Sequence, residues 1–454
     1  MRILVVITLA LLLATCRNEP TLLEQIKQRG ELRVVTRNSA STFYLGADGY
    51  TGFEYDLANL FADHLGVDLR MFAADSFNQI LPSVLAGRAD FAAAGLSITP
   101  SRKEDFWFGP PYMEITPQVV YRYGSDRPGS PEELTDGVIS VVAGSSHAEM
   151  LHDLAEKYEE LEFREREDME ADELLYRVSQ RELDYTVADS TDVALNRRYY
   201  PEIRVAFDLG EPEPLAWAFR RSDDDSLYRA AVAFLEQLRR TGKLAQVIER
   251  HYGHTDRFDY VGTRIFMRHI ETRLPAYRAT FEEAAALTGT DWRLLAAIGY
   301  QESHWDPDAV SPTGVRGLMM LTRATARYVG IDNRLDPEKS ILGGAQYLQM
   351  VKDQVPERIP EPDRTWMALA AYNVGFGHLE DARIITETQG GNPDRWMDVR
   401  ERLPLLTQKK WYKKTEYGYA RGHEPVIYVD NIRSYYDILV WLTNREQPVG
   451  TSAL

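Results

Sequence analysis

The first half of the chain alternates short apolar runs with helical patterns, from about Leu22 to Tyr252. Residues Leu32–Thr36 form an apolar run typical of a strand, and residues Val67–Phe72 alternate as a strand does. Between them, apolar residues recur at every fourth position from Phe53 to Leu65 and Gly66 follows, which predicts one amphipathic helix with a glycine stop. Two further strands, each followed by a helical segment, are predicted at Val138–Val142 and Tyr185–Val187. This rhythm predicts an α/β domain with mainly parallel sheets.

The second half has a different pattern. After Phe266, long helical segments and loops rich in Gly and Pro dominate, with little strand signal. The change places a domain boundary near His254–Gly262, and 454 residues are enough for two or three domains. We therefore expect a signal segment at residues 1–16, an α/β domain at 17–262 and a mainly α-helical domain at 263–454.

The first sixteen residues have the layout of an export signal. Arg2 precedes an apolar run from Ile3 to Ala14, which is too short to span a bilayer and suits a signal-peptide core. The run ends at Ala14-Thr15-Cys16, which resembles a bacterial lipobox and would make Cys16 a lipidated N-terminus after cleavage, although Thr15 departs from the usual pattern. The alternative is a plain signal peptide with an incidental cysteine. Both interpretations predict export, and no other stretch is apolar enough to span a membrane.

Charge and cysteine content narrow the classes of function. The chain has 52 Lys and Arg against 69 Asp and Glu, a net charge of −17, and an acidic chain repels phosphate backbones. Nucleic acid is therefore not expected as a partner. A single cysteine excludes an internal disulfide and a zinc site of several thiolates, and the nine histidines form no HExxH pattern. We expect neither a metal nor a cofactor.

Two motifs in the first domain carry a family resemblance. They are Gly52–Leu57 and Gly95–Arg102, the second followed by Pro110–Tyr112. Together they resemble the signature of amino-acid-type periplasmic solute-binding proteins. The resemblance implies two α/β lobes joined by two crossing strands, with Pro117–Tyr123 and Leu215–Arg221 as candidate hinges and a ligand cleft between the lobes.

An amino acid in such a cleft needs a cation for its carboxylate and an anion for its ammonium. By motif position, Arg102 is the expected carboxylate fork and Asp189 the ammonium partner. The alternatives are a surface arginine after a turn and a helix N-cap, respectively. The other residues expected at this ligand site are Tyr44, Ser97, Thr99, Ser145 and Ser146.

Glu302 is the strongest catalytic candidate. It closes a helix predicted to begin near Thr290-Asp291, and it shares one apolar face with Leu294 and Ile298. Burial disfavours a charged carboxylate and raises its pKa, which is what a general acid needs near neutral pH. The alternative is an exposed glutamate at a frayed helix end.

Motifs around Glu302 resemble a second family. In order they are Gln301–Trp305, Ala309–Met319, Ala371–Gly375 and Tyr428–Ile432. They resemble the Glu-Ser, Gly-Leu-Met, Ala-Tyr-Asn and Tyr-Val motifs of the soluble-lytic-transglycosylase family. The resemblance implies a lysozyme-like helical fold and cleavage of the β-1,4 bond between N-acetylmuramic acid and N-acetylglucosamine in peptidoglycan. Met320 departs from the family, which usually has Gln there.

The family chemistry needs one carboxyl group where most glycosidases use two. Glu302 would protonate the leaving oxygen and then deprotonate the muramyl 6-hydroxyl, which closes a 1,6-anhydro ring. Asp306 and Asp308 are nearby acids, but Asp306-Pro307 is typical of a turn. By motif position, the residues expected to bind substrate or to orient Glu302 are Ser311, Met319, Tyr372, Asn373 and Tyr428.

A late segment reverses the acidic balance of the chain. Arg400–Arg421 has seven bases and two acids, interleaved with Trp411, Tyr412, Tyr417 and Tyr419. Aromatic and basic residues together suit stacking on sugars and contact with an anionic polymer. A surface loop without a ligand is an equally good explanation.

The export signal and the two family resemblances together imply an exported lytic transglycosylase at the periplasmic face of the outer membrane, held peripherally or by a lipid anchor. Its partners would be peptidoglycan strands and, for the first domain, an amino acid or muropeptide that regulates activity. One alternative is a lysozyme-type hydrolase. Another is a solute-binding receptor with an inactive C-terminal domain.

Overall fold

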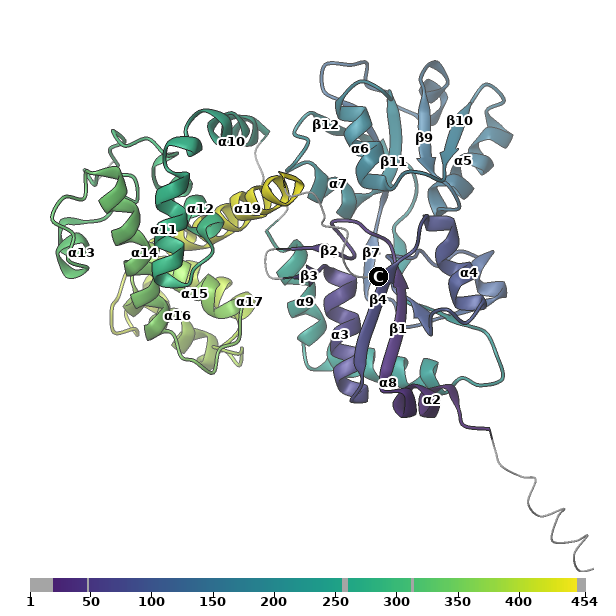
Figure 1. Cartoon of the computed structure of the whole chain (residues 1–454), viewed down its shortest axis with the longest axis horizontal. Coiled ribbons are helices and arrows are strands. Elements are labelled where there is room, and N and C mark those ends of the chain that lie inside the picture. The colour runs from purple at the N-terminus through teal and green to yellow at the C-terminus, as the bar shows by residue number, and fades with distance from the viewer. Residues whose placement is uncertain (1–18, 47–48, 255–259, 312–313, 447–454) are drawn as a thin grey trace, which may run out of the picture.

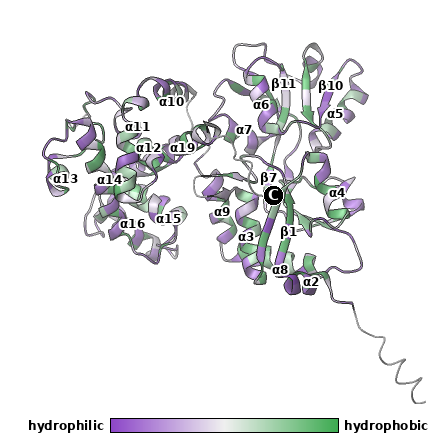
Figure 2. Ribbon diagram, in the orientation of Figure 1, coloured by the Kyte–Doolittle hydropathy of each residue, from purple (hydrophilic) through white to green (hydrophobic). Residues whose placement is uncertain are grey.

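The computed structural model describes residues 19–46, 49–254, 260–311 and 314–446. Two bodies lie side by side, an α/β body up to Tyr252 and an α-helical body from Tyr260 (Figure 1). In each body, hydrophobic residues gather inside and hydrophilic ones along outer helices such as α13 and α16 (Figure 2). The predicted order of fold classes is therefore confirmed.

The first lobe of the α/β body has a five-stranded sheet in the order β4-β1-β5-β14-β6. β1 pairs in parallel with β4 and β5, whereas β14 returns antiparallel to β5 and β6. The strands are β1 (Glu31–Thr36), β4 (Asp68–Ala73), β5 (Phe91–Ala92), β6 (Phe106–Phe108) and β14 (Ala218–Arg220), with a hairpin of β2 (Tyr44–Leu45) and β3 (Tyr50–Thr51). The helices are α2 (Leu22–Arg29), α3 (Phe53–Leu65), α4 (Ile80–Leu85), α8 (Ser226–Arg240) and α9 (Lys243–Tyr252).

The second lobe repeats this architecture with a sheet in the order β10-β9-β11-β8-β12. β9 pairs in parallel with β10 and β11, and β8 runs antiparallel between β11 and β12. The strands are β8 (Pro117–Arg122), β9 (Ile139–Val142), β10 (Phe163–Arg166), β11 (Tyr185–Asp189) and β12 (Ile203–Asp208). The helices are α5 (Ser146–Lys157), α6 (Ala171–Ser179) and α7 (Ser190–Asn196).

A two-stranded ribbon joins the lobes, and it corrects the predicted hinges. β7 (Met113–Ile115) and β13 (Glu213–Leu215) pair antiparallel and belong to neither large sheet. The candidate hinge Pro117–Tyr123 instead contains β8, an inner strand of the second sheet, and Leu215–Arg221 contains β14 of the first sheet. The first crossing therefore lies just before its expected segment, and the second overlaps its expected segment only at Leu215. Strands of three residues leave no periodic signal in the sequence.

The helical body has one hydrophobic core that runs from Phe266 on α10 to Leu439 on α19. The core of the first lobe ends with Val247 and the half-buried Tyr252, so the two cores fall on either side of the predicted boundary segment. The helices are α10 (Tyr260–Thr272), α11 (Arg278–Thr288), α12 (Trp292–Ser303), α13 (Arg323–Tyr328), α14 (Pro337–Gln354), α15 (Asp363–Val374), α16 (Phe376–Thr388), α17 (Trp396–Arg400), α18 (Lys409–Tyr412) and α19 (His423–Glu446).

Helix α19 contacts both bodies. It packs on α12 and α15 within the helical body and extends toward the second lobe (Figure 1). Asp437 accepts hydrogen bonds from Arg198 and His254 at 2.6 and 2.7 Å, and the ring of Trp441 stacks on Tyr199 with centroids 4.6 Å apart. One turn earlier, Arg433 donates to Glu249 of α9 at 2.8 Å. The final described helix thus ties the helical body to both lobes.

Candidate active site and ligand cleft

Glu302 lies in the last turn of α12, where the sequence predicted it. The helix begins as expected, because the side chain of Asp291 caps it by accepting the backbone N–H of Arg293 at 2.8 Å. It ends at His304, which has a left-handed φ of 53° and donates its N–H to Tyr300. This end turns the chain sharply and leaves the Glu302 side chain half-buried against the core.

The carboxyl group of Glu302 has one hydrogen-bond donor among the described residues. The hydroxyl of Tyr428, on α19, donates to Oε1 at 2.6 Å. Burial raises the pKa of Glu302 from 4.5 to about 7, and the Tyr428 hydrogen bond offsets part of that rise. No charged group among the described residues contributes to the shift. A carboxyl group with a pKa of about 7 can both give and take a proton at neutral pH.

Aromatic rings line the region beside Glu302. The rings of Tyr372 and Tyr428 lie parallel with centroids 6.4 Å apart, and Tyr347 packs on Tyr372 at 5.0 Å. The hydroxyl of Tyr372 donates to the carbonyl of Met319 at 3.2 Å. Tyr372 therefore joins helix α15 to the glycine-containing loop that follows α12.

That loop is fastened to the helices by two serines. The Ser303 hydroxyl lies 2.8 Å from the carbonyl of Leu318 and donates to it, and the N–H of Met319 donates to the Ser340 hydroxyl at 3.0 Å. Both serines are buried. The main chain at Met319 is thus held on both sides, by Ser340 and by Tyr372.

Three expected substrate residues lie in differing surroundings. Met319 is fully buried, and a side chain at Gly344 would collide with it, so its side chain fills the core instead of facing a sugar. The hydroxyl of Ser311 accepts the N–H of Val315 within a turn. Asn373 is exposed at the end of α15, next to Tyr372. Asp306, as its sequence suggested, caps a turn by accepting the N–H of Asp308.

In the first domain, Arg102 is buried and bridges the two lobes. Its guanidinium donates to the carbonyl of Ser97 at 2.9 Å, in its own lobe, and to that of Gly144 at 3.0 Å, across the cleft. Asp189 is buried too and pairs with His147 at 2.9 Å. The two residues expected to bind a ligand are therefore both occupied by protein partners in this structure.

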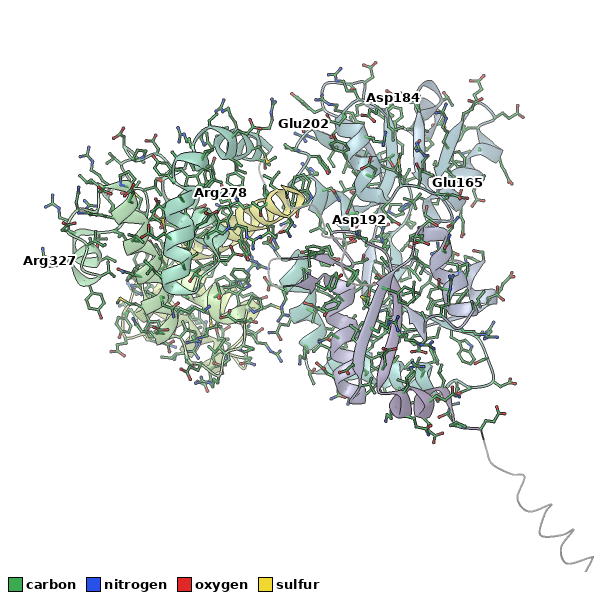
Figure 3. The ribbon with its side chains drawn as sticks, viewed as in Figure 1. Glu165, Asp184, Asp192, Glu202, Arg278 and Arg327 are labelled. Carbon is green, nitrogen blue, oxygen red and sulfur yellow. The ribbon has the colours of Figure 1, made fainter. Side chains whose placement is uncertain are left out.

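A second bridge crosses the same cleft and was not predicted. Arg37, which follows β1, pairs with Asp192 of α7 at 3.0 Å, and both are buried. Asp192 lies where the two lobes meet (Figure 3). Arg37 also interacts electrostatically with Asp189, Glu170 and Asp172. Such a cluster cannot be read from sequence, because Arg37 and Asp192 are 155 residues apart and neither stands in a motif.

The remaining expected ligand residues are distributed around the cleft. Ser145 caps α5 by accepting the N–H of Ala148, and Ser146 is buried beside it. The hydroxyl of Thr99 contacts that of Ser101 at 2.8 Å. Tyr44 instead lines a large cavity between the two bodies, with a volume of about 1360 Å³, together with Tyr199, Asp437 and Trp441.

Two predictions concern membrane attachment. Cys16, the proposed lipidation site, lies outside the described residues. Among the described residues, no helix is both long enough and apolar enough to cross a membrane.

Comparison with known proteins gives two family matches and close relatives along most of the chain. Residues 32–254 match the bacterial extracellular solute-binding proteins, family 3, and residues 279–394 match the transglycosylase SLT domain. Membrane-bound lytic murein transglycosylase F 1 of Alkalilimnicola ehrlichii is 53% identical over 95% of this chain and 88% of that protein. The membrane-bound lytic murein transglycosylase F of Ectopseudomonas mendocina is 51% identical over 95% of this chain and 89% of that protein. The chain belongs to the membrane-bound lytic murein transglycosylase F family.

Proposed function

We propose that this protein cleaves peptidoglycan strands with Glu302 as its one acid–base residue. The observation that carries the proposal is the isolation of this carboxyl group. It has a pKa of about 7, and among the described residues it has a single donor in Tyr428 and no second carboxylate that influences its titration. A glycosidase that activates water usually needs a second carboxylate across the scissile bond, so a lone carboxyl suits a reaction in which the sugar supplies the nucleophile.

In this reaction Glu302 gives up one proton and takes another in its place. The Glu302 carboxyl protonates the oxygen that links N-acetylmuramic acid to N-acetylglucosamine, and the bond from that oxygen to the anomeric carbon breaks. The substrate N-acetyl group stabilises the positive charge on that carbon. The Glu302 carboxylate then takes the proton of the muramyl 6-hydroxyl, whose oxygen bonds to the anomeric carbon and closes the anhydro ring. The enzyme is returned to its protonated state without adding water.

Four side chains support this role without taking part in proton transfer. Tyr428 orients the carboxyl group, Tyr372 and Asn373 border the sugar subsites, and Ser311 belongs to the loop that faces them. Met319 contributes its main chain, which Ser340 and Tyr372 hold in place.

Mass analysis of the muropeptides released from purified peptidoglycan tests the reaction type. Each cut by this mechanism leaves a 1,6-anhydromuramyl end, which is one water lighter than a reducing end. We expect anhydro ends as the main product from the wild type and none from Glu302→Gln. Reducing ends as the main product would instead support a lysozyme-type hydrolase.

We also propose that the first domain binds an amino acid or muropeptide and thereby regulates Glu302. Helix α19 supports this role, because it holds Tyr428 against Glu302 and, two to three turns later, contacts the second lobe through Asp437 and Trp441. The lobe contact comes from Arg198 and Tyr199, directly after α7, whose Asp192 closes the cleft with Arg37. A ligand that separates Arg37 from Asp192 would shift α7 and, through it, α19.

Calorimetry beside activity assays tests this coupling. Coupling free energies are typically about 1–3 kcal/mol, or roughly 5–150-fold in affinity. Binding of amino acids and muropeptides is measured first, and the rate of peptidoglycan cleavage is then compared with and without the ligand. We expect Arg102→Ala to lose binding and Asp437→Asn to keep binding while losing the change in rate. Binding without any effect on rate in the wild type would reduce the first domain to a docking module.

For localisation, we propose export to the periplasmic face of the outer membrane, with Cys16 as a lipid anchor. The membrane-bound relatives support an association with the envelope. Labelling with a palmitate analogue, compared between the wild type and Cys16→Ser, tests the anchor. Unlabelled wild-type protein in the membrane fraction would favour peripheral contact.

A further inference from the structure

The segment Arg400–Arg421, from the last residue of α17 to just before α19, carries a group of cations that the proposed reaction does not use. Three of its seven bases are arginines in ion pairs: Arg400 with Glu249 and Asp430, Arg402 with Glu401, and Arg421 with Glu424. The other four are exposed lysines, and in the part of the chain that the structure describes none of them forms an ion pair. We define the lysine–aromatic patch as Lys409, Lys410, Lys413, Lys414, Tyr417 and Tyr419.

The absence of local partners is notable because the chain has 69 acidic residues. Four ammonium groups within six positions repel one another, and nearby carboxylates would relieve that repulsion. Glu416, the nearest acid along the chain, does not pair with them. The patch therefore presents a positive surface on an acidic protein, and such a surface complements an anion from outside the chain.

The lysines are arranged around a fixed ring. Trp411 is half-buried against the core of the helical body. The Nζ atoms of Lys410 and Lys414 lie 5.4 and 5.8 Å from the centre of its ring, within cation–π range. Two of the four charges are thus positioned by the fold, which lowers the entropy that binding would cost.

The loop that carries the two tyrosines is also anchored. The buried carboxylate of Asp381 accepts the N–H groups of Glu416 and Tyr417 at 3.1 and 3.0 Å. Gly377 makes room for the ring of Tyr417, since any side chain there would collide with it. Even so, Tyr417 and Tyr419 remain 56% and 57% exposed. The protein therefore holds two tyrosine rings in solvent on a loop that is fixed to α16.

The anchor places the patch next to the proposed active site. Gly377, under the ring of Tyr417, follows Asn373 by four residues, and a chain of that length spans at most about 15 Å. On its other side the loop leads into α19, the helix that carries Tyr428. A polymer bound across Tyr372 and Asn373 would therefore have the patch within reach.

We propose that the lysine–aromatic patch binds the carboxylates of the peptide stems carried by the glycan strand that Glu302 cuts. The proposal rests on the proposed function, because it takes peptidoglycan as the substrate. The amide-substituted sugars of such a strand are neutral in themselves, so the negative charge of the polymer lies mainly on its stems. The exposed rings of Tyr417 and Tyr419 offer flat faces to the sugars between them. The patch makes the enzyme prefer strands that carry stems over bare strands.

A comparison of two substrates tests the proposal. One is soluble glycan strand with its stems. The other is the same strand after an amidase has removed them, which leaves one lactyl carboxylate on each muramic acid in place of the several carboxylates of the stem. The patch variant replaces all four lysines by glutamine. A matched control makes the same change in net charge at four exposed cations of the first domain: Lys27, Arg220, Arg240 and Lys243.

The measured quantity is the ratio of kcat/KM for stem-bearing over bare strands. We expect this ratio to fall about tenfold in the patch variant, to stay unchanged in the control, and to fall in the wild type as salt rises. A ratio that is unchanged in the patch variant, or that falls equally in the control, would overturn the proposal. A second result would also overturn the proposal. If the wild type sediments with phosphatidylglycerol vesicles, the patch variant does not, and the ratio is unchanged, then the patch contacts a membrane.

Binding provides a readout that does not depend on the reaction. With Glu302→Gln as the background, the protein binds sacculi without cutting them, and the patch variant should be retained about tenfold less than the control. Failure of the proposed function would be seen in a different measurement: the wild type would yield no anhydro ends from either substrate. Equal retention of the patch variant and the control would overturn the patch alone.

Discussion

Glu54 and Glu302 are both glutamates on helices whose pKa is raised by burial, yet their surroundings differ. Glu54 lies in the first turn of α3 and accepts three hydrogen bonds, from the Tyr112 hydroxyl, from Trp217 at 2.9 Å and from the N–H of Gly95 at 2.8 Å. Glu302 lies in the last turn of α12 and accepts one, from Tyr428. A helix favours a negative charge at its N-terminus and disfavours one at its C-terminus.

The difference indicates that the Glu54 carboxyl has a structural role, whereas the Glu302 carboxyl is available for proton transfer. The oxygens of Glu54 accept from donors in three separate loop segments, so Glu54 holds the first lobe together and has little capacity left for a ligand or a proton acceptor. Glu302 keeps an oxygen without a protein donor among the described residues. Burial alone raises the pKa of both, so the number of donors is the more informative property.

The largest effect should come from Glu302→Gln. The amide keeps the shape and the Tyr428 hydrogen bond but cannot donate the proton, and general acid–base residues contribute about 10²–10⁴-fold to rate. We expect release of anhydro-muropeptides to fall by at least this factor while the melting temperature stays close to that of the wild type. If the variant retains more than a few per cent of wild-type turnover, Glu302 is not the acid–base residue.

The second effect is on pH dependence. Glu302 must begin the reaction protonated, so kcat should fall about tenfold per unit as pH rises above about 7. A profile that stays flat to pH 9 would place the essential proton on another group.

The same titration affects stability. The pKa of Glu302 is 4.5 in an unfolded chain and about 7 when folded, so its protonated form favours folding fully below pH 4.5. That contribution, on the order of 3 kcal/mol, is lost as pH rises to about 7. Denaturant unfolding of Glu302→Gln should lack this pH dependence, whereas an unchanged slope between pH 4.5 and 7 would contradict the raised pKa.

The third prediction concerns Glu54→Gln. The amide replaces one carboxylate oxygen with an N–H₂ group, which then faces either the Trp217 donor or the Tyr112 and Gly95 donors. An unmet buried polar group costs about 1–3 kcal/mol. We expect the free energy of unfolding of the first domain to fall by that amount, measured with denaturant and tryptophan fluorescence. Glu236→Gln serves as the control, because the Glu236 side chain is exposed on α8. Equal stability of the two variants would show that Glu54 is not locked in place.

The smallest effect should come from Tyr428→Phe. Its hydrogen bond lowers the pKa of Glu302, so the variant should move the fall in kcat to higher pH and lose less than tenfold in rate at its optimum. Tyr436→Phe is the matched control, because it removes another α19 hydroxyl, bonded to Asp291 away from Glu302. A shift of the profile in both variants would point to a disturbance of α19 instead.

Sequence alone was sufficient where the determinants are local. The helix from Phe53 to Leu65 and its glycine stop follow from period and capping, as does the Asp291 start of α12. The raised pKa of Glu302 was expected from the apolar face that it shares with Leu294 and Ile298. The pairing of Tyr428 with Glu302 came from family motifs, since 126 residues separate them.

The features that sequence could not give depend on long-range geometry. The ribbon of β7 and β13 has three residues per strand, too few for a pattern. Arg37 pairs with Asp192 only because the two lobes close on each other. Met319 stands in a motif, yet its side chain is directed by the space at Gly344, and that space exists only after α14 has packed.

The separation of Tyr428 from Glu302 also orders events in time. A ribosome adds about 5–20 residues per second, so the catalytic carboxyl is made roughly 6–25 s before the tyrosine 126 positions later in the chain. Until α19 emerges and packs on α12, the carboxyl lacks its orienting partner and the helical body lacks one of its central helices. The complete active site therefore forms only after α19, which is made well after Glu302, has packed on α12.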